Sequence, residues 1–249
     1  MGSRLYGVTE DKVPKGLMKV NGKSLVERSI EKLKSIGIEK IFIVTGHLSE
    51  QYDELSKKDK CIETKKNRCY KATGSMTSLA ILENKVKEDF ILLESDLIYE
   101  VNALIETILF KKKDCILLSG RTNSGDECYV EIKNKNLYKI SKNKEQIHEV
   151  YGELVGISKI SIRLYKNMIK RYKALVSEDN ETQELEDIEK KSMKKHDYEN
   201  IIFDIAKNNE VGYLKIDDLT WGEIDDRSHL ERVKKYILPK LNETIVKAD

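Results

Sequence analysis

Short, uninterrupted apolar runs separated by helical segments are the feature that most restricts the fold of this chain. Residues 41–44, 90–93 and 115–118 are four-residue apolar runs bounded by polar or turn residues. Such runs are typical of parallel strands that are buried on both faces of a sheet. Helical segments lie between them, so strand and helix alternate as far as residue 119. The pattern predicts an α/β fold with a mostly parallel central sheet flanked by helices.

Helix signals occupy the intervals between these runs. Ser24 and Glu27 have the spacing of a capping box, apolar residues then recur at helical spacing, and Gly37 ends the segment. Further helices are expected near residues 50–55, 75–82, 101–110, 162–175, 198–206 and 230–238, and further strands at 62–64 and 212–216.

The pattern changes after Gly120. Residues 127–132 and 137–140 are predicted as short strands around a polar turn, and residues 149–157 are also expected to be extended. Residues 178–189 are acidic and residues 190–195 basic, which is typical of a solvated helix or loop. We therefore expect a single domain, residues 1–249, in which about 121–160 form a small β-rich extension that binds substrate.

The charge balance excludes several classes of partner. Lys and Arg total 45 and Asp and Glu total 43, so the net charge is only +2 and gives no general attraction to nucleic acid or anionic membranes. No apolar run approaches the roughly 20 residues of a membrane-spanning helix, and no signal peptide is visible, so a cytoplasmic location is expected. The cysteines form no C-x-x-C pair, so we expect reduced thiols, with Cys115 in the core.

Glycine turns and basic residues are concentrated at the start of the chain, in Gly2-Ser3-Arg4, Pro14-Lys15-Gly16 and Val20-Asn21-Gly22. Backbone N–H groups of a glycine turn can bind phosphates, and Arg4 and Lys15 add positive charge. This combination suits a nucleoside triphosphate that is attacked at its α-phosphate. A glycine-rich phosphate loop normally follows a strand, and only Met1 precedes Gly2. We therefore expect a sheet built from these residues alone to lack a strand and to expose unpaired backbone.

Carboxylates follow two of the predicted strands. Asp96 comes directly after the apolar run at 90–93, and Asp225 follows a short strand that begins at Trp221. Ligands of open α/β sheets bind at the carboxyl ends of the strands, where a carboxylate can hold Mg²⁺ beside a triphosphate. The alternative is that Asp96 and Asp226 cap the helices that follow them.

Polar turns supply further candidates. Thr73-Gly74-Ser75-Met76-Thr77-Ser78 could contact a base edge or a phosphate, or simply begin a helix. Asp126, Glu127 and Tyr129 lie beside the predicted hairpin and could accept a substrate ammonium, although a surface turn is the alternative, and Glu153 has the same ambiguity. The four histidines lack the spacing of metal ligands, and no Ser/His/Asp arrangement is present.

Together these motifs resemble those of the nucleotidyltransferase family, over nearly the whole chain except the first strand. The chain is similar to the small cytidylyltransferases that activate phosphocholine or 2-aminoethylphosphonate. The motifs at 74–79, 92–100, 122–127 and 152–158 resemble the 2-aminoethylphosphonate branch. The resemblance implies a Rossmann-like fold and Mg²⁺-dependent attack of the phosphonate oxygen on the α-phosphate of CTP, which gives CMP-2-aminoethylphosphonate and pyrophosphate.

The resemblance also implies roles for particular residues. Lys15, with Arg4, would be catalytic. Gly2, Ser3, Arg4 and Lys15 would contact the CTP phosphates; Thr73, Gly74, Ser75 and Ser78 the cytidine; Asp96 and Asp225 the Mg²⁺; and Asp126, Glu127, Tyr129 and Glu153 the aminoethyl group. A homodimer and a fused or associated aminotransferase are further expectations. Phosphocholine, a sugar phosphate and a non-catalytic nucleotide-binding module remain alternatives, whereas a nucleic-acid or membrane partner is not expected.

Overall fold

The computed structural model describes residues 12–183 and 195–241. The predicted phosphate-loop residues Gly2, Ser3 and Arg4 therefore lie outside the described residues. Among the predicted positions, Lys15 is the first that the structure places, in a short 3-10 helix, η2 (Lys15–Leu17). Part of the stretch predicted as an acidic helix or loop is helical as far as Gln183, and its remainder lies outside the described ranges.

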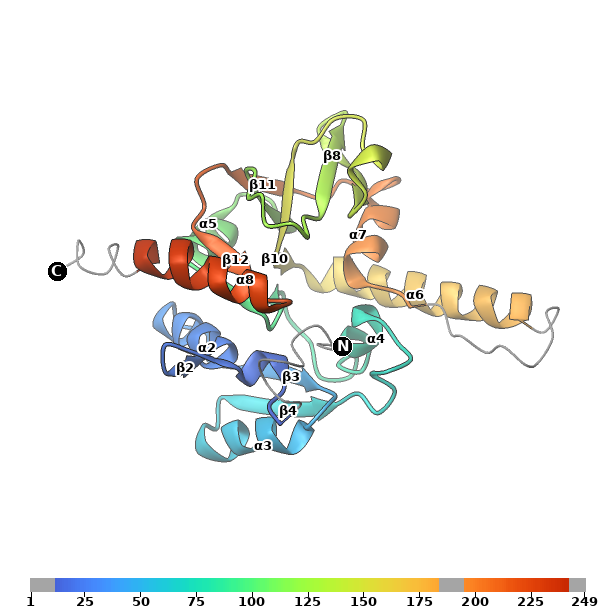
Figure 1. The fold of residues 1–249 in the computed structure, drawn as a ribbon. Helices are drawn as coiled ribbons and strands as arrows, with labels where there is room; N and C mark the ends of the chain where they lie inside the picture. The colour runs from blue at the N-terminus through green and yellow to red at the C-terminus, as the bar shows by residue number, and fades with distance from the viewer. Residues whose placement is uncertain (1–11, 184–194, 242–249) are drawn as a thin grey trace.

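A mixed β-sheet forms the centre of the molecule (Figure 1). Its strands in spatial order are β11 (Tyr213–Ile216), β7 (Cys115–Ser119), β10 (Gly152–Ile160), β8 (Tyr129–Lys133) and β9 (Asn136–Ser141), and β5 (Phe90–Leu93) also pairs with β10. β10 is antiparallel to β5, β7 and β8, while β11 and β7 are parallel. The predicted α/β fold is confirmed.

The described part of the sheet is mixed, in contrast to the mostly parallel arrangement that the apolar runs predicted. The reason is the hairpin of β8 and β9, which turns the chain back on itself. The next strand, β10, therefore enters against the direction of β5 and β7 and pairs with both of them. β5 and β7 are still parallel to each other, since both are antiparallel to β10, and β3 (Ile41–Thr45) is parallel to β4 (Ile62–Lys66).

Helices lie where the sequence predicted them, with shifted ends. They are α2 (Leu25–Ser35), α3 (Ser49–Lys58), α4 (Ser75–Ala80), α5 (Asn102–Leu109), α6 (Ile162–Gln183), α7 (Tyr198–Ala206) and α8 (Arg227–Arg232), which continues into a π-helical stretch, η4 (Val233–Ile237). A short 3-10 helix, η3 (Lys144–Gln146), follows β9. Two small pairings complete the fold: β1 (Lys19–Val20) with β2 (Lys23–Ser24), and β6 (Leu97–Tyr99) with β12 (Trp221–Glu223).

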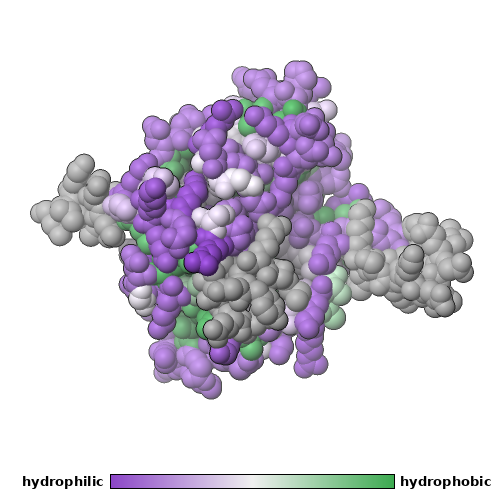
Figure 2. Space-filling model, viewed as in Figure 1, coloured by the Kyte–Doolittle hydropathy of each residue, from purple (hydrophilic) through white to green (hydrophobic). Residues whose placement is uncertain are grey.

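Apolar residues pack into three clusters around these elements. The first cluster joins α4, α6 and α7 to one face of the central sheet, and the second joins α2, β3 and α5 to the opposite face of that sheet. The third holds the C-terminal helices against the β1–β2 turn. Cys115 is fully buried, as expected, and the four cysteines are free thiols. The visible surface is largely hydrophilic (Figure 2). No helix within the described residues is long and apolar enough to cross a membrane.

The capping box at α2 gives a first testable prediction. The Ser24 side chain accepts a hydrogen bond from the Glu27 backbone, and the Glu27 carboxylate accepts one from the Ser24 backbone. We expect Ser24→Ala to lower the free energy of unfolding by about 1 kcal/mol, because both contacts at the helix start depend on this residue. Denaturant unfolding measures the loss, with exposed Ser35→Ala at the other end of α2 as the control. Equal stabilities of the two variants would contradict a stabilising role for the cap.

Candidate active site

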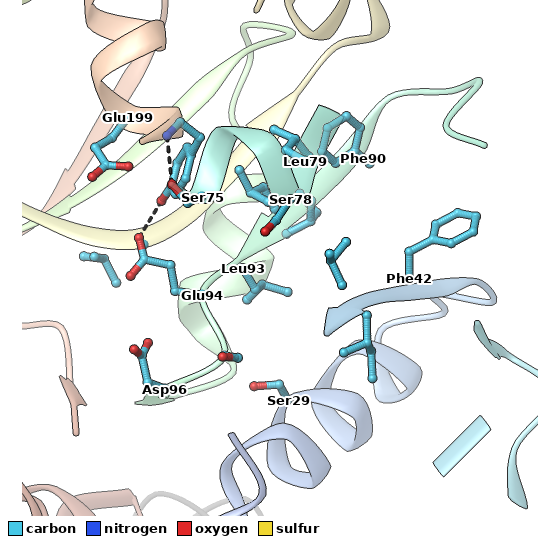
Figure 3. A pocket seen from close by; sticks show the side chains of 18 of the residues that line it. Ser29, Phe42, Ser75, Ser78, Leu79, Phe90, Leu93, Glu94, Asp96 and Glu199 are labelled. Atoms are coloured by element: carbon cyan, nitrogen blue, oxygen red, sulfur yellow. Dashed lines mark hydrogen bonds between the residues drawn. The ribbon is translucent and has the colours of Figure 1, made fainter. Parts of the chain in front are cut away.

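A large cavity of about 1170 Å³ opens between the β3 side of the molecule and the central sheet. Apolar residues from β3, β5, α2 and α4 line one part of it, and carboxylates line the other. Figure 3 shows this division, with Phe42 and Phe90 on one side and Glu94 and Asp96 on the other. The carboxylate part lies at the C-terminal end of β5, where ligands bind in open α/β sheets.

Lys15 connects the two predicted metal-binding carboxylates. Its Nζ atom is 2.5 Å from Oδ2 of Asp96 and also forms an ion pair with Asp225, which is 210 positions away in the sequence. η2 can bring Lys15 this close because Gly16 packs tightly against the end of β5. A Cβ on Gly16 would lie 2.6 Å from the Tyr52 hydroxyl and 3.3 Å from the Ser95 carbonyl oxygen. The three predicted residues therefore form one cluster.

Charge attraction dominates the electrostatics of this cluster. Burial alone would lower the pKa of Lys15, but the nearby carboxylates of Asp96 and Asp225 outweigh burial and raise that pKa above its ordinary value. Burial opposes ionisation of Asp225 as well, yet the Lys15 ammonium holds the pKa of this carboxyl below its ordinary value. Lys15 and Asp225 are therefore both charged at neutral pH, so Lys15 is available as a cation beside a triphosphate.

The carboxylates of the cluster also fit a divalent cation. Among the residues that the structure describes, Oδ1 of Asp96 is buried and has no hydrogen-bond partner, and a buried oxygen in this condition is a ready metal ligand. Oxygens of Asp126, Glu223 and Asp225 lie within 4.8 Å of one another. Asp96 is thus not the helix cap that the alternative interpretation required, because α5 begins after Val101 without a side-chain cap. Asp226 does cap α8, by accepting a hydrogen bond from the backbone of His229 at 2.9 Å.

Glu94 is a half-buried carboxylate for which no role was predicted from the sequence. A bulge in β10 at Gly156, which has a positive φ of 81°, makes room for it, since a Cβ there would lie 2.9 Å from the Glu94 carboxyl carbon. The Tyr198 hydroxyl donates a hydrogen bond to Glu94 at 2.8 Å. Burial, together with the charge of Asp96, raises the pKa of Glu94 to about 8.

Two more carboxylates line the same part of the cavity. Burial raises the pKa of Glu199, in the first turn of α7, to about 7. Burial and the charge of Asp225 raise the pKa of Glu223, at the end of β12, to about 7. These raised pKa values indicate carboxylates that are crowded together and would gain from a bound cation.

The predicted nucleotide-binding turn lies at the start of α4. Nδ2 of Asn67 donates hydrogen bonds of 3.1 Å to the hydroxyls of both Thr73 and Ser78, so these side chains are held on one small network. The Ser75 side chain does not join this network. Its hydroxyl accepts a hydrogen bond from the Tyr198 backbone at 2.9 Å, which connects α4 to α7. Gly74 begins the helix without a side-chain cap. Ser75 and Ser78 line the cavity.

The four residues predicted for the amine end of the substrate differ in position. Asp126, Glu127 and Glu153 line the cavity, and Lys142 lies 3.0 Å from Asp126. The Glu153 carboxylate accepts two hydrogen bonds from Thr122, one from the backbone and one from the hydroxyl. Tyr129 does not line the cavity; its hydroxyl donates to Glu127 at 3.2 Å. The hairpin thus brings carboxylates rather than the expected aromatic ring to the cavity.

The comparison with known proteins agrees with this geometry. Residues 1–129 match the family described as the MobA-like NTP transferase domain. The match covers more than half of the chain, so the chain belongs to the MobA-like NTP transferase family. The expected nucleotidyltransferase class is confirmed at the level of the family.

Individual relatives extend the similarity beyond residue 129. A bifunctional GlmU protein from Methanococcus maripaludis is 29% identical over 166 residues, which cover 66% of this chain and 39% of that protein. A CTP:phosphoglutamine cytidylyltransferase from Campylobacter jejuni is 26% identical over 92% of this chain and 94% of its own length. The structure of a CTP:phosphocholine cytidylyltransferase from Streptococcus pneumoniae superposes with a TM-score of 0.70 at 20% identity, covering 94% and 93% of the two chains. This last likeness is one of fold.

Proposed function

We propose that this protein is a cytidylyltransferase that transfers CMP from CTP to a small phosphonate or phosphate carrying an amine, with 2-aminoethylphosphonate as the preferred acceptor. The observation that carries the proposal is the division of charge in the cavity. Lys15 with Asp96 and Asp225 forms a cluster suited to phosphates and a metal, and the excess carboxylates Glu94 and Glu199 line the same cavity. The similarity to a CTP-using relative along 92% of the chain supports the nucleotide.

The chemistry needs no general base. The acceptor oxygen of a phosphonate or phosphate carries negative charge near neutral pH, so it can attack the α-phosphorus of CTP directly. The new P–O bond forms as the bond between the α-phosphorus and the bridging oxygen to the β-phosphate breaks, and pyrophosphate leaves with that electron pair. The difficulty is that two anions must approach each other. Positioning and charge neutralisation are therefore the tasks of the protein.

Lys15 is the residue that we assign to charge neutralisation. Its pKa is raised by the two carboxylates, so it stays protonated while substrates bind. When a nucleotide enters, its ammonium can exchange one carboxylate contact for an α-phosphate oxygen without leaving the cluster. Asp96 and Asp225 would hold Mg²⁺, with Asp126 and Glu223 close enough to assist. The ion would supply neutralisation of phosphate charge and orientation of the triphosphate.

The remaining carboxylates of the cavity are the groups to which we assign recognition of the acceptor substrate. A primary ammonium donates three hydrogen bonds and is matched by several carboxylate oxygens. Glu94 directly follows β5 and Glu199 lies in α7, and the Tyr198 hydroxyl donates a hydrogen bond to Glu94. We propose that they receive the ammonium, and that the β8–β9 hairpin, with Asp126 and Glu127, forms the substrate-binding extension of a single domain. The nucleotide contacts of Thr73, Gly74, Ser75 and Ser78 remain part of the same proposal.

The rate of pyrophosphate release with different acceptor substrates tests the proposed specificity. CTP and Mg²⁺ are supplied with 2-aminoethylphosphonate, phosphocholine or a sugar 1-phosphate in parallel reactions. The proposal expects the highest kcat/KM with 2-aminoethylphosphonate. A preference for phosphocholine would instead assign Tyr198 and Trp221, which both line the cavity, to a quaternary ammonium. A sugar phosphate as the best substrate, or no reaction with any of the three, would contradict an amine-specific site.

Glu199→Gln gives the second prediction. The amide keeps the shape of the side chain and removes its charge, so the KM for the amine substrate should rise about tenfold or more, while the KM for CTP stays within about twofold. Steady-state kinetics with each substrate varied separately measures both values. Glu106→Gln, on the exposed side of α5, is the matched control. An equal rise in both KM values would indicate a structural role for Glu199.

A further inference from the structure

The helices α4 and α7 cap each other instead of themselves. Gly74 precedes α4 and has no side chain to cap it, and Asp197 precedes α7 without capping it. The Asp197 carboxylate instead accepts a hydrogen bond of 3.0 Å from the backbone of Ser75, the first residue of α4. The Ser75 hydroxyl in turn accepts one of 2.9 Å from the backbone of Tyr198, the first residue of α7. We call this pair of contacts the reciprocal caps.

Close packing of the two backbones surrounds the reciprocal caps. The Met76 backbone donates a hydrogen bond of 3.1 Å to the carbonyl of His196, and both residues are buried. Gly74 permits this approach, because a Cβ there would lie 2.6 Å from the His196 carbonyl carbon and 2.7 Å from Oδ1 of Asp197. Two backbone N–H groups at the start of α4 are therefore bonded within the protein, although such groups often bind ligands.

The hydroxyl hydrogen of Ser75 is used in the same way. This hydroxyl donates to Oδ1 of Asp197 at 3.2 Å, and a hydroxyl has only one hydrogen to donate. Thr73 and Ser78 belong instead to the separate network of Asn67, which follows β4. The nucleotide turn thus has two supports: Asn67 holds one part of it, and the start of α7 holds the other.

The reciprocal caps also fix the end of α7 at which the proposed acceptor carboxylates lie. Tyr198 is bonded to Ser75 through its backbone and to Glu94 through its hydroxyl, and Figure 3 shows Ser75 and Glu94 at the two ends of this connection. Glu199 follows in the same turn of α7. The other end of α7 is held separately, because Nδ2 of Asn136 donates a hydrogen bond of 2.6 Å to the carbonyl of its last residue. Loss of the reciprocal caps would therefore release the end that carries the carboxylates.

α6 supports the segment that precedes α7. Nε2 of His196 lies 2.7 Å from Oδ2 of Asp179, and the ring of Tyr172 packs edge-on against the His196 ring at a centroid distance of 5.9 Å. The Tyr172 hydroxyl also lies within hydrogen-bond distance of the Thr77 hydroxyl in α4, at 2.8 Å. Three helices thus meet at the reciprocal caps, so the relative position of α4 and α7 is defined by several contacts.

We propose that Ser75 and Asp197 are positioning residues, which hold the acceptor carboxylates of α7 at a fixed place relative to the nucleotide turn of α4. The inference rests on the proposed function, because that function assigns the acceptor ammonium to Glu94 and Glu199. In-line attack depends on where the acceptor oxygen lies relative to the α-phosphorus, and a displacement of about 1 Å can lower a rate about 100-fold. The reciprocal caps join the two parts of the cavity that would hold the two reactants.

Two substitutions of Asp197 provide the main test. Asp197→Ala removes the cap, whereas Oδ1 of the asparagine in Asp197→Asn can still accept the hydrogen bond from Ser75. We expect Asp197→Ala to raise the KM for the acceptor at least about tenfold. The dissociation constant of CTP, measured by calorimetry without acceptor, should stay within about threefold, because Asn67 still holds its part of the turn. Asp197→Asn should stay within about threefold of the unmodified protein in both values.

Ser75→Ala tests the same connection from the other helix. It should raise the KM for the acceptor as much as Asp197→Ala does. The double variant should be no worse than either single variant, because both substitutions disable one shared unit. All KM values are measured with 2-aminoethylphosphonate, or with phosphocholine or the sugar 1-phosphate if one of these reacts faster.

Amide hydrogen exchange gives a measurement that does not depend on the acceptor. Asp197→Ala should speed exchange of the Ser75 amide at least about tenfold, and Ser75→Ala should do the same for the Tyr198 amide, each in the other helix. Ser24→Ala is the matched control, since it removes an ordinary cap outside the cavity. It should speed exchange only at the start of α2 and leave the KM for the acceptor within about twofold.

Three results would overturn the proposal. If Asp197→Asn raises the KM for the acceptor as much as Asp197→Ala does, the charge of Asp197 acts on the substrate directly. If Ser75→Ala weakens CTP binding tenfold and leaves the KM for the acceptor unchanged, Ser75 is a nucleotide contact. If neither amide exchanges faster in the variants, the reciprocal caps do not form in solution. Failure of the proposed function is a different result, in which the fastest acceptor carries no amine or none of the three acceptors reacts.

Discussion

Lys15→Ala is expected to lower kcat for pyrophosphate release by at least about 100-fold while the folded structure is retained. The variant removes the ammonium that pairs with Asp96 and Asp225, so two anions must then meet without the positive charge that offsets their repulsion. The expected loss corresponds to about 2.7 kcal/mol of transition-state stabilisation. Because the effect is confined to the transition state, the KM for CTP should change less than kcat.

A second lysine–aspartate pair provides the control for this prediction. Lys34 and Asp59 form an exposed ion pair of 2.7 Å between α2 and the end of α3. Lys34→Ala should leave kcat within about twofold of the unmodified protein, because exposed pairs contribute little. Circular dichroism should show the same helix content in both variants. A rate within tenfold of the original for Lys15→Ala would mean that another group neutralises the α-phosphate.

The convergence of Lys15, Asp96 and Asp225 could be predicted from the sequence because each residue has a local signal. The carboxylates follow predicted strands, and the lysine lies in a glycine-containing turn. The structure shows why the two aspartates lie close together. Asp96 directly precedes β6, Asp225 follows shortly after β12, and these two strands pair with Leu97 opposite Glu223. The pairing itself was not predicted, because three-residue strands carry almost no sequence pattern.

Glu199 and Tyr129 show where prediction from sequence fails. Glu199 enters the cavity because the Ser75 hydroxyl attaches α7 to α4, a contact between residues that are 123 positions apart. No local pattern marks such a residue. Tyr129 was expected at the site because it follows two acids, but the next residue, Val130, is fully buried in the core. Successive side chains of a strand point to opposite faces, so burial of Val130 determines where Tyr129 points.

The mixed strand directions of the central sheet also could not be predicted from local sequence patterns. The apolar runs at β3, β5 and β7 correctly indicated strands, but run composition does not reveal the direction in which the next strand enters. The direction of β10 depends on the hairpin that precedes it, and a bulge at Gly156 then shifts the register between Leu154 and Ser158. The same bulge gives Glu94 its space. The feature that was hardest to predict in the fold is therefore also the feature that shapes one of the carboxylates in the cavity.

Asp96→Asn is expected to lower kcat/KM by at least about 100-fold and to weaken Mg²⁺ binding by at least tenfold. Oδ1 of Asp96 is buried and has no hydrogen-bond partner within the described part of the chain, so it is available to a cation, and the amide removes the charge while the side chain keeps its shape. Titration of the Mg²⁺ dependence of pyrophosphate release measures the first effect, and calorimetric titration of the protein–CTP complex with Mg²⁺ measures the second.

Asp59→Asn is the matched substitution, since Asp59 also pairs with a lysine but lies outside the cavity. It should leave both the rate and the Mg²⁺ affinity unchanged. The double variant Asp96→Asn/Lys15→Ala distinguishes two roles of Asp96, which are to hold Lys15 in place and to bind Mg²⁺. If Asp96 acts only by holding Lys15, the double variant should be no slower than Lys15→Ala alone, and Mg²⁺ affinity should not fall. A further loss of rate together with weaker Mg²⁺ binding would place Asp96 on the metal itself.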